Sequence, residues 1–295
     1  MSAIWAVGEA LIDLIPDSSG VLQPVVGGGP ANTAKALAGL DLESFFIGGI
    51  STDSYGKLIG QELSEAGVDL SLAHKSELPT ATATVSLDGK GRARYEFKLD
   101  GTATFDFTAD WLPKGRPMVV HVGTLVTIVE PGVVALFQWL EKLGVPIVFD
   151  PNVRSSVLGD VARYRALVEK WVSISSVVKV SDEDIAWLYP DKNYLEIAKE
   201  WIGKGVALVV VTRGADGLVG ITAQSICNVD GVKVNVVDTV GAGDTVGAIV
   251  VEAIVEHGLE ALESERLTLV LERAAKAAAI TCTRAGAKPP RREEL

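Results

Sequence analysis

The chain has 295 residues, of which 48% are hydrophobic, and a formal net charge of −11. This length accommodates one large α/β domain, and the lack of a basic face excludes binding to a phosphate backbone, so we expect no nucleic acid partner. The chain has only two cysteines, Cys227 and Cys282, no apolar run of membrane-spanning length and no basic signal region at its N-terminus, which together indicate a cytoplasmic protein without a membrane partner.

The first third of the chain alternates predicted strands and helices and then changes to a pattern of alternating polar and small or apolar residues. Residues 3–15 predict a buried strand interrupted at Gly8 and Glu9, and residues 27–40 predict a glycine turn followed by a helix with Pro30 in its first turn. Residues 45–51 predict a strand, and residues 53–68 predict a helix that stops at Gly67. Residues 80–99 alternate polar with small or apolar side chains around an Asp-Gly-Lys-Gly turn, which predicts a β-hairpin.

The rest of the chain follows a regular rhythm of apolar strands and helices. Strands are expected within residues 118–125, 146–152, 176–181 and 206–222, with a further apolar alternation at 232–238, and helices within 130–144, 160–172, 182–190, 243–257 and 264–279. Valine and isoleucine runs between helices predict a doubly wound, mostly parallel sheet that helices cover on both faces, with the hairpin as a small lid. We expect a single domain over residues 1–295 and a disordered tail at 288–295.

Polar clusters follow the predicted strands at the point where each strand ends. They occupy residues 150–154, 181–184, 212–214 and 238–244. In open parallel sheets ligands bind beyond the carboxyl ends of the strands, so these clusters are expected to lie around one site.

The cluster nearest the C-terminus, within "VDTVGAGDTVGA" (residues 237–248), places glycines and a carboxylate ahead of an apolar helix. Gly241, Ala242 and Gly243 can present backbone N–H groups at the helix N-terminus, where they attract an anion. Asp244 is then either an N-cap or the proton acceptor that phosphoryl transfer requires. The chain has no G-x-x-x-x-G-K-[ST] phosphate loop, and "GGGPAN" lacks the spacing of the dinucleotide fingerprint.

Two motifs about two hundred residues apart resemble the signatures of the ribokinase-like (PfkB) carbohydrate kinases. These are "GGGPANTA" near the N-terminus and "DTVGAGDT" near the C-terminus, and "GEALIDLIP", "DPNVR", "KVSDEDI" and "CTRAGA" look most like fructokinases. The resemblance spans essentially the whole chain and implies ATP-dependent phosphorylation of a sugar hydroxyl. Asp244 would be the base, residues 241–243 the anion hole, and Arg154 a neutralising group for the phosphates. A carboxylate at a helix N-terminus is expected to have a lowered pKa.

The resemblance also assigns the binding residues. For the sugar it implies Asp13, Gly28, Gly29 and Asn32, although Asn32 could instead cap its own helix and Asp13 could be a solvated strand end. For the nucleotide it implies Ser181, Thr212, Gly214 and Gly217. The family's Asn-x-x-Glu motif is replaced by Ser181 and Asp184, so Mg²⁺ would be held near Asp184 through water and the ATP phosphates.

Ion activation and assembly are further implications of the resemblance. A K⁺ ion would be held by Asp238, Val240, Thr281, Arg284 and Gly286, while Pro290 stands where some relatives have a serine. The lid would comprise about residues 11–25 and 80–108. Pairing of two lids in a homodimer is implied, with a hairpin that folds over its own site as the alternative.

The sugar is the open part of the functional assignment. Conversion of fructose to fructose 6-phosphate is expected, and a 2-keto-3-deoxygluconate kinase or a ribokinase is the alternative on the same fold. A nucleoside kinase would need aromatic stacking surfaces in the lid, where Tyr95 and Phe97 are the obvious candidates. A non-catalytic sugar-binding regulatory protein is a different class. The altered Ser181 and Asp184 favour it, whereas the intact Asp244 argues against it.

Overall fold

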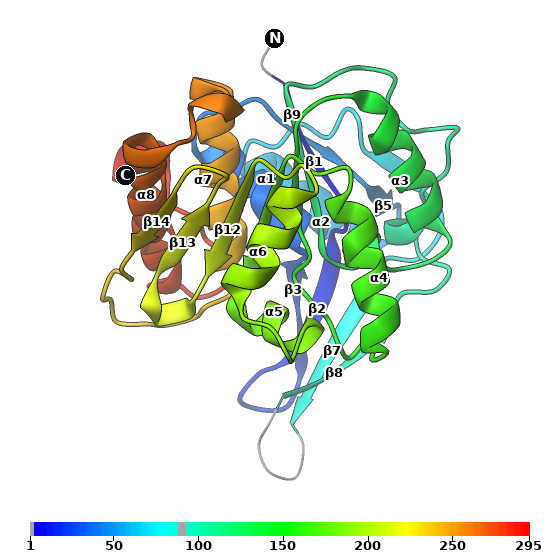
Figure 1. Ribbon diagram of the computed structural model, residues 1–295. Helices are drawn as coiled ribbons and strands as arrows, with labels where there is room; N and C mark the ends of the chain where they lie inside the picture. Colours follow the sequence, from blue (N-terminus) through cyan, green and yellow to red (C-terminus); the bar gives the residue numbers. More distant parts are fainter. Residues whose placement is uncertain (1–2, 88–92) are drawn as a thin grey trace.

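The computed structural model describes residues 3–87 and 93–295, and its centre is an eight-stranded sheet (Figure 1). All neighbours in this sheet are parallel except β13, which runs antiparallel to both β12 and β14. The order is β14 (Ile226–Val229), β13 (Leu218–Ile221), β12 (Leu208–Thr212), β11 (Val177–Ser181), β10 (Ile147–Asp150), β9 (Val119–Gly123), β1 (Ile4–Val7) and β4 (Ser44–Ile47).

Helices cover both faces of this sheet, so the predicted doubly wound α/β architecture is confirmed. One face packs against α1 (Gly29–Gly39), α7 (Ala242–His257) and α8 (Ser264–Cys282), and the other against α3 (Gly132–Leu143), α4 (Val161–Val172), α5 (Asp182–Leu188) and α6 (Tyr194–Gly203). The strands alternate between the two cores. Val120 and Val122 belong to one cluster of buried residues and Val119 to the other. Burial on both faces explains why these strands are apolar almost throughout.

A second, four-stranded sheet lies against one edge of the molecule, and its β7–β8 hairpin projects from the body in Figure 1. Its order is β3 (Leu22–Gly27), β2 (Leu11–Pro16), β7 (Thr82–Leu87) and β8 (Ala93–Lys98). β7 and β8 are antiparallel, whereas β2 and β7 are parallel. These strands come from the two segments expected to form a lid. The Asp-Gly-Lys-Gly turn between β7 and β8 lies outside the described residues.

The chain passes from the large sheet to the small one at Gly8, which explains the interruption expected in the first strand. Gly8 has φ +151°, and a Cβ atom there would lie 2.3 Å from Cγ of Pro30. Only glycine accommodates both the backbone conformation and this contact. A similar break separates β4 from β5 (Gly49–Ser51), which pairs with β6 (His74–Ser76) beside α2 (Ser54–Glu65).

Three segments differ from the sequence-based predictions. Residues 232–236, expected to continue the series of strands, have neither helix nor strand, and β14 lies before them instead. The helix α6 was not among the predicted elements, although it begins with a capping box made by Asn193 and Glu196. The 232–236 segment has alternating valines, but it lies beside a cavity rather than beside a strand.

The C-terminal tail is ordered, and the prediction of disorder is wrong. Arg292 donates to Glu256 Oε1 at 2.6 Å and to the Leu40 carbonyl at 3.3 Å, and Arg284 pairs with Glu294. Leu295 packs against the cluster of apolar residues between α7, α8 and the sheet. The charged composition of the tail indicated exposure, but its ion pairs fix it against α1 and α7.

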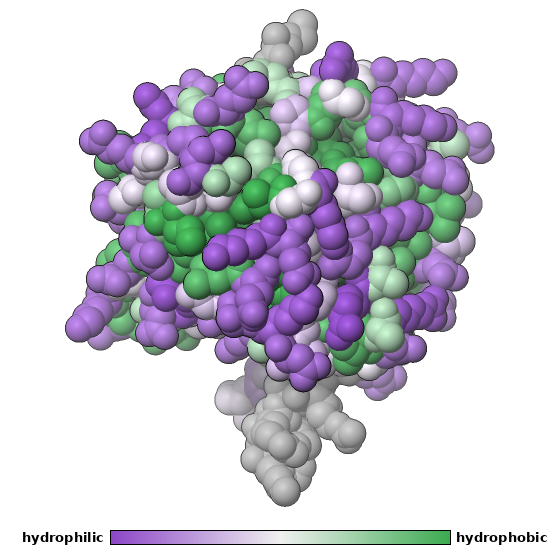
Figure 2. Space-filling model, in the orientation of Figure 1, coloured by the Kyte–Doolittle hydropathy of each residue, from purple (hydrophilic) through white to green (hydrophobic). Residues whose placement is uncertain are grey.

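Residues 3–87 and 93–295 include no candidate membrane-spanning helix. No helix there is both long and apolar enough to cross a bilayer. The face seen in Figure 2 is mostly hydrophilic, with an apolar area over the β12–β14 end of the sheet, where Ile226 is exposed. Cys227 and Cys282 are unpaired, as expected.

Deleting residues 291–295 tests whether the tail contributes to folding. We expect the free energy of unfolding to fall by about 1–3 kcal/mol, because a partly buried leucine and exposed ion pairs are lost. The measurement is urea unfolding followed by circular dichroism. Arg163→Ala, which removes only the exposed pair with Glu130, is the control and should change stability by less than about 0.5 kcal/mol. A truncated chain as stable as the wild type would show that the tail contacts contribute nothing.

Candidate active site

Two cavities meet at the N-terminus of α7. The first, of about 510 Å³, lies between the small sheet and the carboxyl ends of the central strands and has many polar residues in its wall; we call it the polar cleft. The second, of about 520 Å³, lies between the β12–β13 turn, α7 and α8 and is lined mainly by valine, alanine and glycine; we call it the apolar groove. Thr239 and Gly243 line both. A molecule in the cleft and one in the groove would therefore face each other across this turn.

The turn ahead of α7 depends on glycine. Gly241 is the N-cap of the helix with φ +81°, and a Cβ atom there would lie 2.7 Å from Cβ of Ala287. Ala242 N–H donates to the Thr239 carbonyl at 3.2 Å. Gly243 follows within the first helical turn, where backbone N–H groups have no partner inside the helix. The turn thus offers an anion the N–H of Gly243 and the positive end of the α7 dipole, while the N–H of Ala242 is already bonded.

Asp244 is buried in the first turn of α7 and faces the polar cleft. It does not cap the helix, because the N-cap is Gly241 and no side chain bonds there. Asn32 Nδ2 donates to Asp244 Oδ2 at 2.9 Å, so Asn32 does not cap its own helix either. This bond links the two motifs that lie about two hundred residues apart.

The pKa of Asp244 differs from the expectation. Burial raises it to about 6, although Lys179, Asn32 and Arg154 act in the opposite direction. The helix N-terminus was expected to lower the pKa, but desolvation outweighs it. Asp244 is therefore a stronger base than expected and remains mostly ionised above pH 7.

The glycines at the start of α1 bring the backbone close to Asp244. A Cβ atom on Gly29 would lie 2.6 Å from Thr124 Oγ1 and 3.3 Å from Asp244 Oδ1. A Cβ atom on Gly28, which has φ +112°, would lie 2.4 Å from the Glu9 carbonyl oxygen. Asp13 lines the same cleft from β2, and burial raises its pKa to about 6. Asp13, Gly28, Gly29 and Asn32 are thus brought together beside Asp244.

The polar cleft holds buried oxygen atoms that lack hydrogen-bond partners. Glu9 Oε1 and Asn32 Oδ1 belong to this group among the described residues. Glu9 lines the cleft and accepts from the Val126 N–H through its other oxygen, and burial raises its pKa to about 7. Buried acceptors without partners are costly unless a bound molecule donates to them. The cleft is therefore suited to a ligand rich in hydroxyl groups.

Arg154 lies in the wall of the polar cleft, where the sequence-based expectation put it beside a phosphate. Its Nη1 donates to Asn152 Oδ1 at 2.7 Å and to the Val153 carbonyl at 3.0 Å. Its charge acts to lower the pKa of Glu9, Asp13 and Asp244. Arg154 thus balances the negative charge of the cleft.

A buried ion pair that the sequence analysis missed lies under the α7 turn. Lys179 Nζ is 2.7 Å from Asp150 Oδ2, and the two side chains are 6% and 2% exposed. A Cβ atom on Gly243 would lie 3.0 Å from Lys179 Nζ. The signal in the sequence was a lysine inside the apolar strand "VVKVS", since charged residues are rarely buried without a functional or ionic partner.

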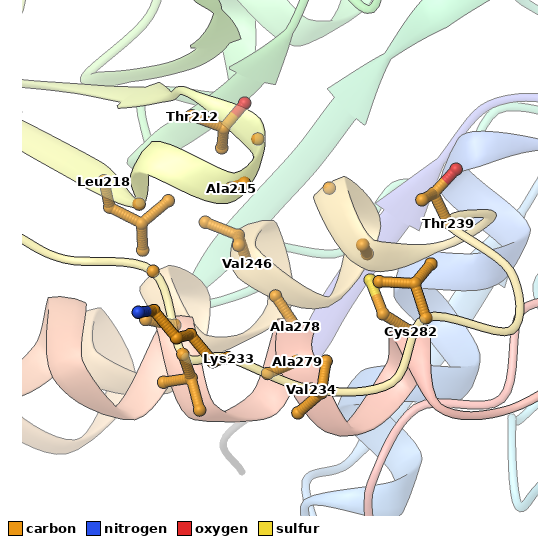
Figure 3. A pocket seen from close by; sticks show the side chains of 18 residues that line it. Thr212, Ala215, Leu218, Lys233, Val234, Thr239, Val246, Ala278, Ala279 and Cys282 are labelled. Atoms are coloured by element: carbon orange, nitrogen blue, oxygen red, sulfur yellow. The ribbon is translucent and has the colours of Figure 1, made fainter.

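The residues expected to bind a nucleotide divide into two groups. Thr212, Gly214 and Gly217 line the apolar groove, and Figure 3 shows Thr212, Ala215 and Leu218 on one side of it, Val234, Ala278, Ala279 and Cys282 on the other, and Val246 between them. Ser181 and Asp184 line neither cavity. Ser181 instead caps α5 by accepting from Asp184 N–H at 3.0 Å.

The residues expected around K⁺ lie on the turn ahead of α7, at the C-terminal end of α8 and on the chain that follows α8. Asp238 accepts from Val240 N–H at 3.1 Å and from Gly286 N–H at 2.8 Å, which ties the turn ahead of α7 to the chain after α8. The carbonyls of Thr281 and Gly286 accept the N–H groups of Arg284 and Lys288. Carbonyl and carboxylate oxygens keep further lone pairs, so this donor set suits a hard cation. No cluster of three or more metal-binding His, Cys, Asp or Glu side chains occurs within residues 3–87 and 93–295.

Comparisons with known proteins agree with this geometry. A family model described as pfkB family carbohydrate kinase matches residues 1–294. The chain is 31% identical to the fructokinase of Escherichia coli, over 100% of this chain and 99% of that protein, and 34% identical to the fructokinase of Rhizobium leguminosarum bv. trifolii, over 83% and 77%. It also resembles the structure of the Vibrio cholerae O395 fructokinase in its fructose, ADP and calcium ion bound form, with 28% identity, a TM-score of 0.86 and coverage of 97% of this chain and 94% of that one.

The match extends over nearly the whole length, and both glycine-containing motifs line the polar cleft, while the one near the C-terminus also lines the apolar groove. The chain therefore belongs to the pfkB family of carbohydrate kinases and is a sugar kinase.

Proposed function

We propose that the protein transfers the γ-phosphoryl group of ATP to the 6-hydroxyl of fructose, giving fructose 6-phosphate and ADP. The observation that carries this proposal is the polar cleft, whose wall contains the carboxylate of Asp244 and two buried acceptor oxygens without partners, Glu9 Oε1 and Asn32 Oδ1. Hydroxyl groups of a sugar can donate to these oxygens. The relatives from E. coli and R. leguminosarum are fructokinases, which supports fructose as the substrate.

In this proposal, one substrate lies in each of the two cavities. The apolar groove, which is in the size range of ligand pockets, receives ATP, with the base against its aliphatic walls and Thr212, Gly214 and Gly217 around the rest of the nucleotide. The polar cleft receives the sugar, which Asp13, Asn32 and the backbone at Gly28 and Gly29 hold. The γ-phosphoryl group then lies at the α7 turn, over Gly243.

Asp244 acts as the base in this arrangement. The sugar hydroxyl attacks the γ-phosphorus, its proton passes to Asp244, and the bond to the bridging oxygen of ADP breaks. Phosphoryl transfer needs little early deprotonation, so a carboxylate with a pKa of about 6 is sufficient. The bond from Asn32 orients the carboxylate from the sugar side of the cleft. A base retained in this position disfavours a non-catalytic sugar-binding protein.

The charge of the cleft favours a neutral acceptor. The carboxyls of Glu9, Asp13 and Asp244 line it, against the charges of Arg154 and of Lys179, which is already paired with Asp150. A sugar acid such as 2-keto-3-deoxygluconate would add a further negative charge to this set. The geometry therefore favours a neutral ketose or aldose over a keto acid.

Two cations fit the residues present. Mg²⁺ would be held by water and by the ATP phosphates rather than by a protein cage, and would neutralise charge on the phosphate oxygens. K⁺ would lie between the loops tied together by Asp238, with the carbonyls of Val240, Thr281, Arg284 and Gly286 as its other ligands, and would add positive charge beside the α7 turn.

The small sheet acts as a lid and as a dimer interface in this proposal. β3 is its edge strand, and Ile15, Val21, Leu22 and Val25, on or next to β2 and β3, are exposed. An exposed apolar edge needs a cover, and a second lid supplies the same surface. The homodimer is thus proposed to form through the lids.

A panel of acceptors tests the substrate. We expect ADP release with fructose to exceed release with ribose, 2-keto-3-deoxygluconate and nucleosides in kcat/KM, because the cleft presents acceptors to hydroxyls and repels carboxylates. A coupled assay for ADP, run with and without K⁺, makes the measurement. Binding of sugar with no turnover of any acceptor would contradict the kinase assignment, and a preference for a keto acid would contradict the choice of fructose.

The pH dependence of turnover tests the role of Asp244. Since the pKa of Asp244 in the protein without substrates is raised to about 6, kcat/KM for fructose should be constant near pH 8 and fall as the pH drops through 6, when the carboxylate is protonated. Asp244→Asn should lower kcat by about 10²–10⁴-fold while fructose still binds. If the residual activity of Asp244→Asn shows the same fall at low pH, the group that titrates is Asp13 or Glu9, whose pKa values are also raised.

Light scattering tests the dimer. The wild type should have twice the mass of one chain, and Leu22→Lys, which puts a charge on the edge strand, should shift it to a monomer. Val134→Lys, at an equally exposed valine on α3, should leave the mass unchanged. A wild type with the mass of one chain would contradict the dimer, and the lid would then close only over the polar cleft of its own chain.

A further inference from the structure

We propose that Lys179 is a catalytic residue, whose ammonium group binds the phosphoryl group as it crosses from the apolar groove to the polar cleft, and that Asp150 positions it. The inference deepens the proposed kinase function and depends on it. It concerns a residue that lies on a central strand rather than on the loops where the two family motifs lie.

The sheet directs both side chains of the pair at the α7 turn. Val177 and Val148 belong to the buried cluster on the α7 side of the sheet, and side chains alternate along a strand. Lys179 and Asp150, two residues further along β11 and β10, therefore point to the same side. They lie at the carboxyl ends of neighbouring parallel strands, below the first turn of α7.

The position of the ammonium group matches the junction of the two cavities. Lys179 lines the polar cleft, and its Nζ would be 3.0 Å from a Cβ atom on Gly243, one of the two residues that line both cavities. One N–H of the ammonium donates to Asp150, which leaves two donors. Among the described residues, Arg154 is the other lysine or arginine that lines the polar cleft, and its Nη1 is bonded to Asn152 and Val153.

Lys179 remains charged in this environment. Burial alone would lower its pKa, but the negative charges of Asp150, Asp244 and Asp184 outweigh burial and raise it. His121, on the same side of the sheet, is neutral, because burial lowers its pKa to about 4. A buried ammonium of this kind is fixed before the substrates bind, so it stabilises developing charge without reorganisation.

The chemistry assigns Lys179 a role distinct from that of Asp244. The bond between the γ-phosphorus and the bridging oxygen of ADP breaks, the bond to the sugar oxygen forms, and the sugar proton passes to Asp244. Lys179 keeps its protons throughout and donates hydrogen bonds to the oxygens of the transferred group. Asp150 Oδ1 has no partner, so the carboxylate is held by Lys179 and serves only to orient it.

The test removes both charges together. Lys179→Met alone would leave Asp150 buried without a counter-ion and could unfold the protein, whereas the double variant Asp150→Asn/Lys179→Met removes the whole pair. The matched control is Glu62→Gln/Lys35→Met. It removes another ion pair with a buried lysine, in which Lys35 Nζ is 2.8 Å from Glu62 Oε1. Neither residue of this pair lines the polar cleft or the apolar groove. Asp150→Asn alone keeps the ammonium group of Lys179 but removes the carboxylate charge that orients it.

Two readouts separate a catalytic role from a structural one. The double variant should lose about 10²–10³-fold in kcat, with the KM for fructose and the affinity for ADP unchanged. Calorimetric titration of aluminium fluoride into protein with ADP and fructose should show a loss of affinity of the same size, because this fluoride mimics the phosphoryl group in transfer. Asp150→Asn should show a smaller loss of both quantities, and the control variant neither. Melting temperatures check that all variants are folded.

The outcomes separate this inference from the proposed function. If the wild type phosphorylates fructose and the double variant turns over as fast as the control, Lys179 is not catalytic. If the double variant loses fructose or ADP binding together with turnover, its role is structural and the inference is likewise overturned. If the wild type phosphorylates no sugar, the proposed function fails before the variants are considered.

Discussion

Burial of the Asp244 carboxylate where two cavities meet is the constraint on which the rest of the site depends. A carboxylate out of water is unstable unless neighbouring groups compensate it, and here an amide from α1 and an ammonium from β11 do so. These groups come from distant parts of the chain, since Asn32 and Lys179 are far apart in sequence and both are far from Asp244. Placing them together requires α1 to pack directly against α7, and the small residues at the start of both helices permit that approach. The position of the buried carboxylate, the glycine motifs and the order of the strands thus depend on the same packing of α1 against α7.

The same constraint explains why the two cavities differ in character. On the α1 side, carboxylates, amides and one arginine gather around the cleft, and several acceptor atoms lack partners. On the α8 side, the groove has aliphatic walls and a segment, 232–236, that forms no ladder with the sheet. In the proposed function, the cleft provides hydrogen-bond acceptors for the sugar and the groove provides an apolar surface for the base of ATP. The polar cleft would limit which sugars bind, whereas the turn ahead of α7 lines both cavities.

The sequence predicted the architecture well because it depends on local patterns. Apolar runs and helical periodicity located the central strands and most helices, and the glycine motifs located the turn.

Quantities set by tertiary packing were not predictable in this way. The pKa of Asp244 was expected to fall, because the helix terminus is visible in the sequence whereas the extent of burial is not. The ion pair of Lys179 and Asp150 was missed since nothing local shows that β10 and β11 are neighbours. The ordered tail and the irregular 232–236 segment were misjudged from composition and alternation, which do not reveal ion-pair partners or the absence of a neighbouring strand.

The wall residues of the two cavities also occupy different parts of the chain. Apart from the turn at 239–244, the polar cleft is built from residues up to Lys179, and the apolar groove is built from Thr212 onward. Substitutions in the first part of the gene can therefore alter the acceptor without changing how the phosphoryl donor is held. In terms of the proposed function, a protein with this division can acquire a new acceptor while it keeps the same phosphoryl donor. Thr239 and Gly243 would stay unchanged, because they line both cavities.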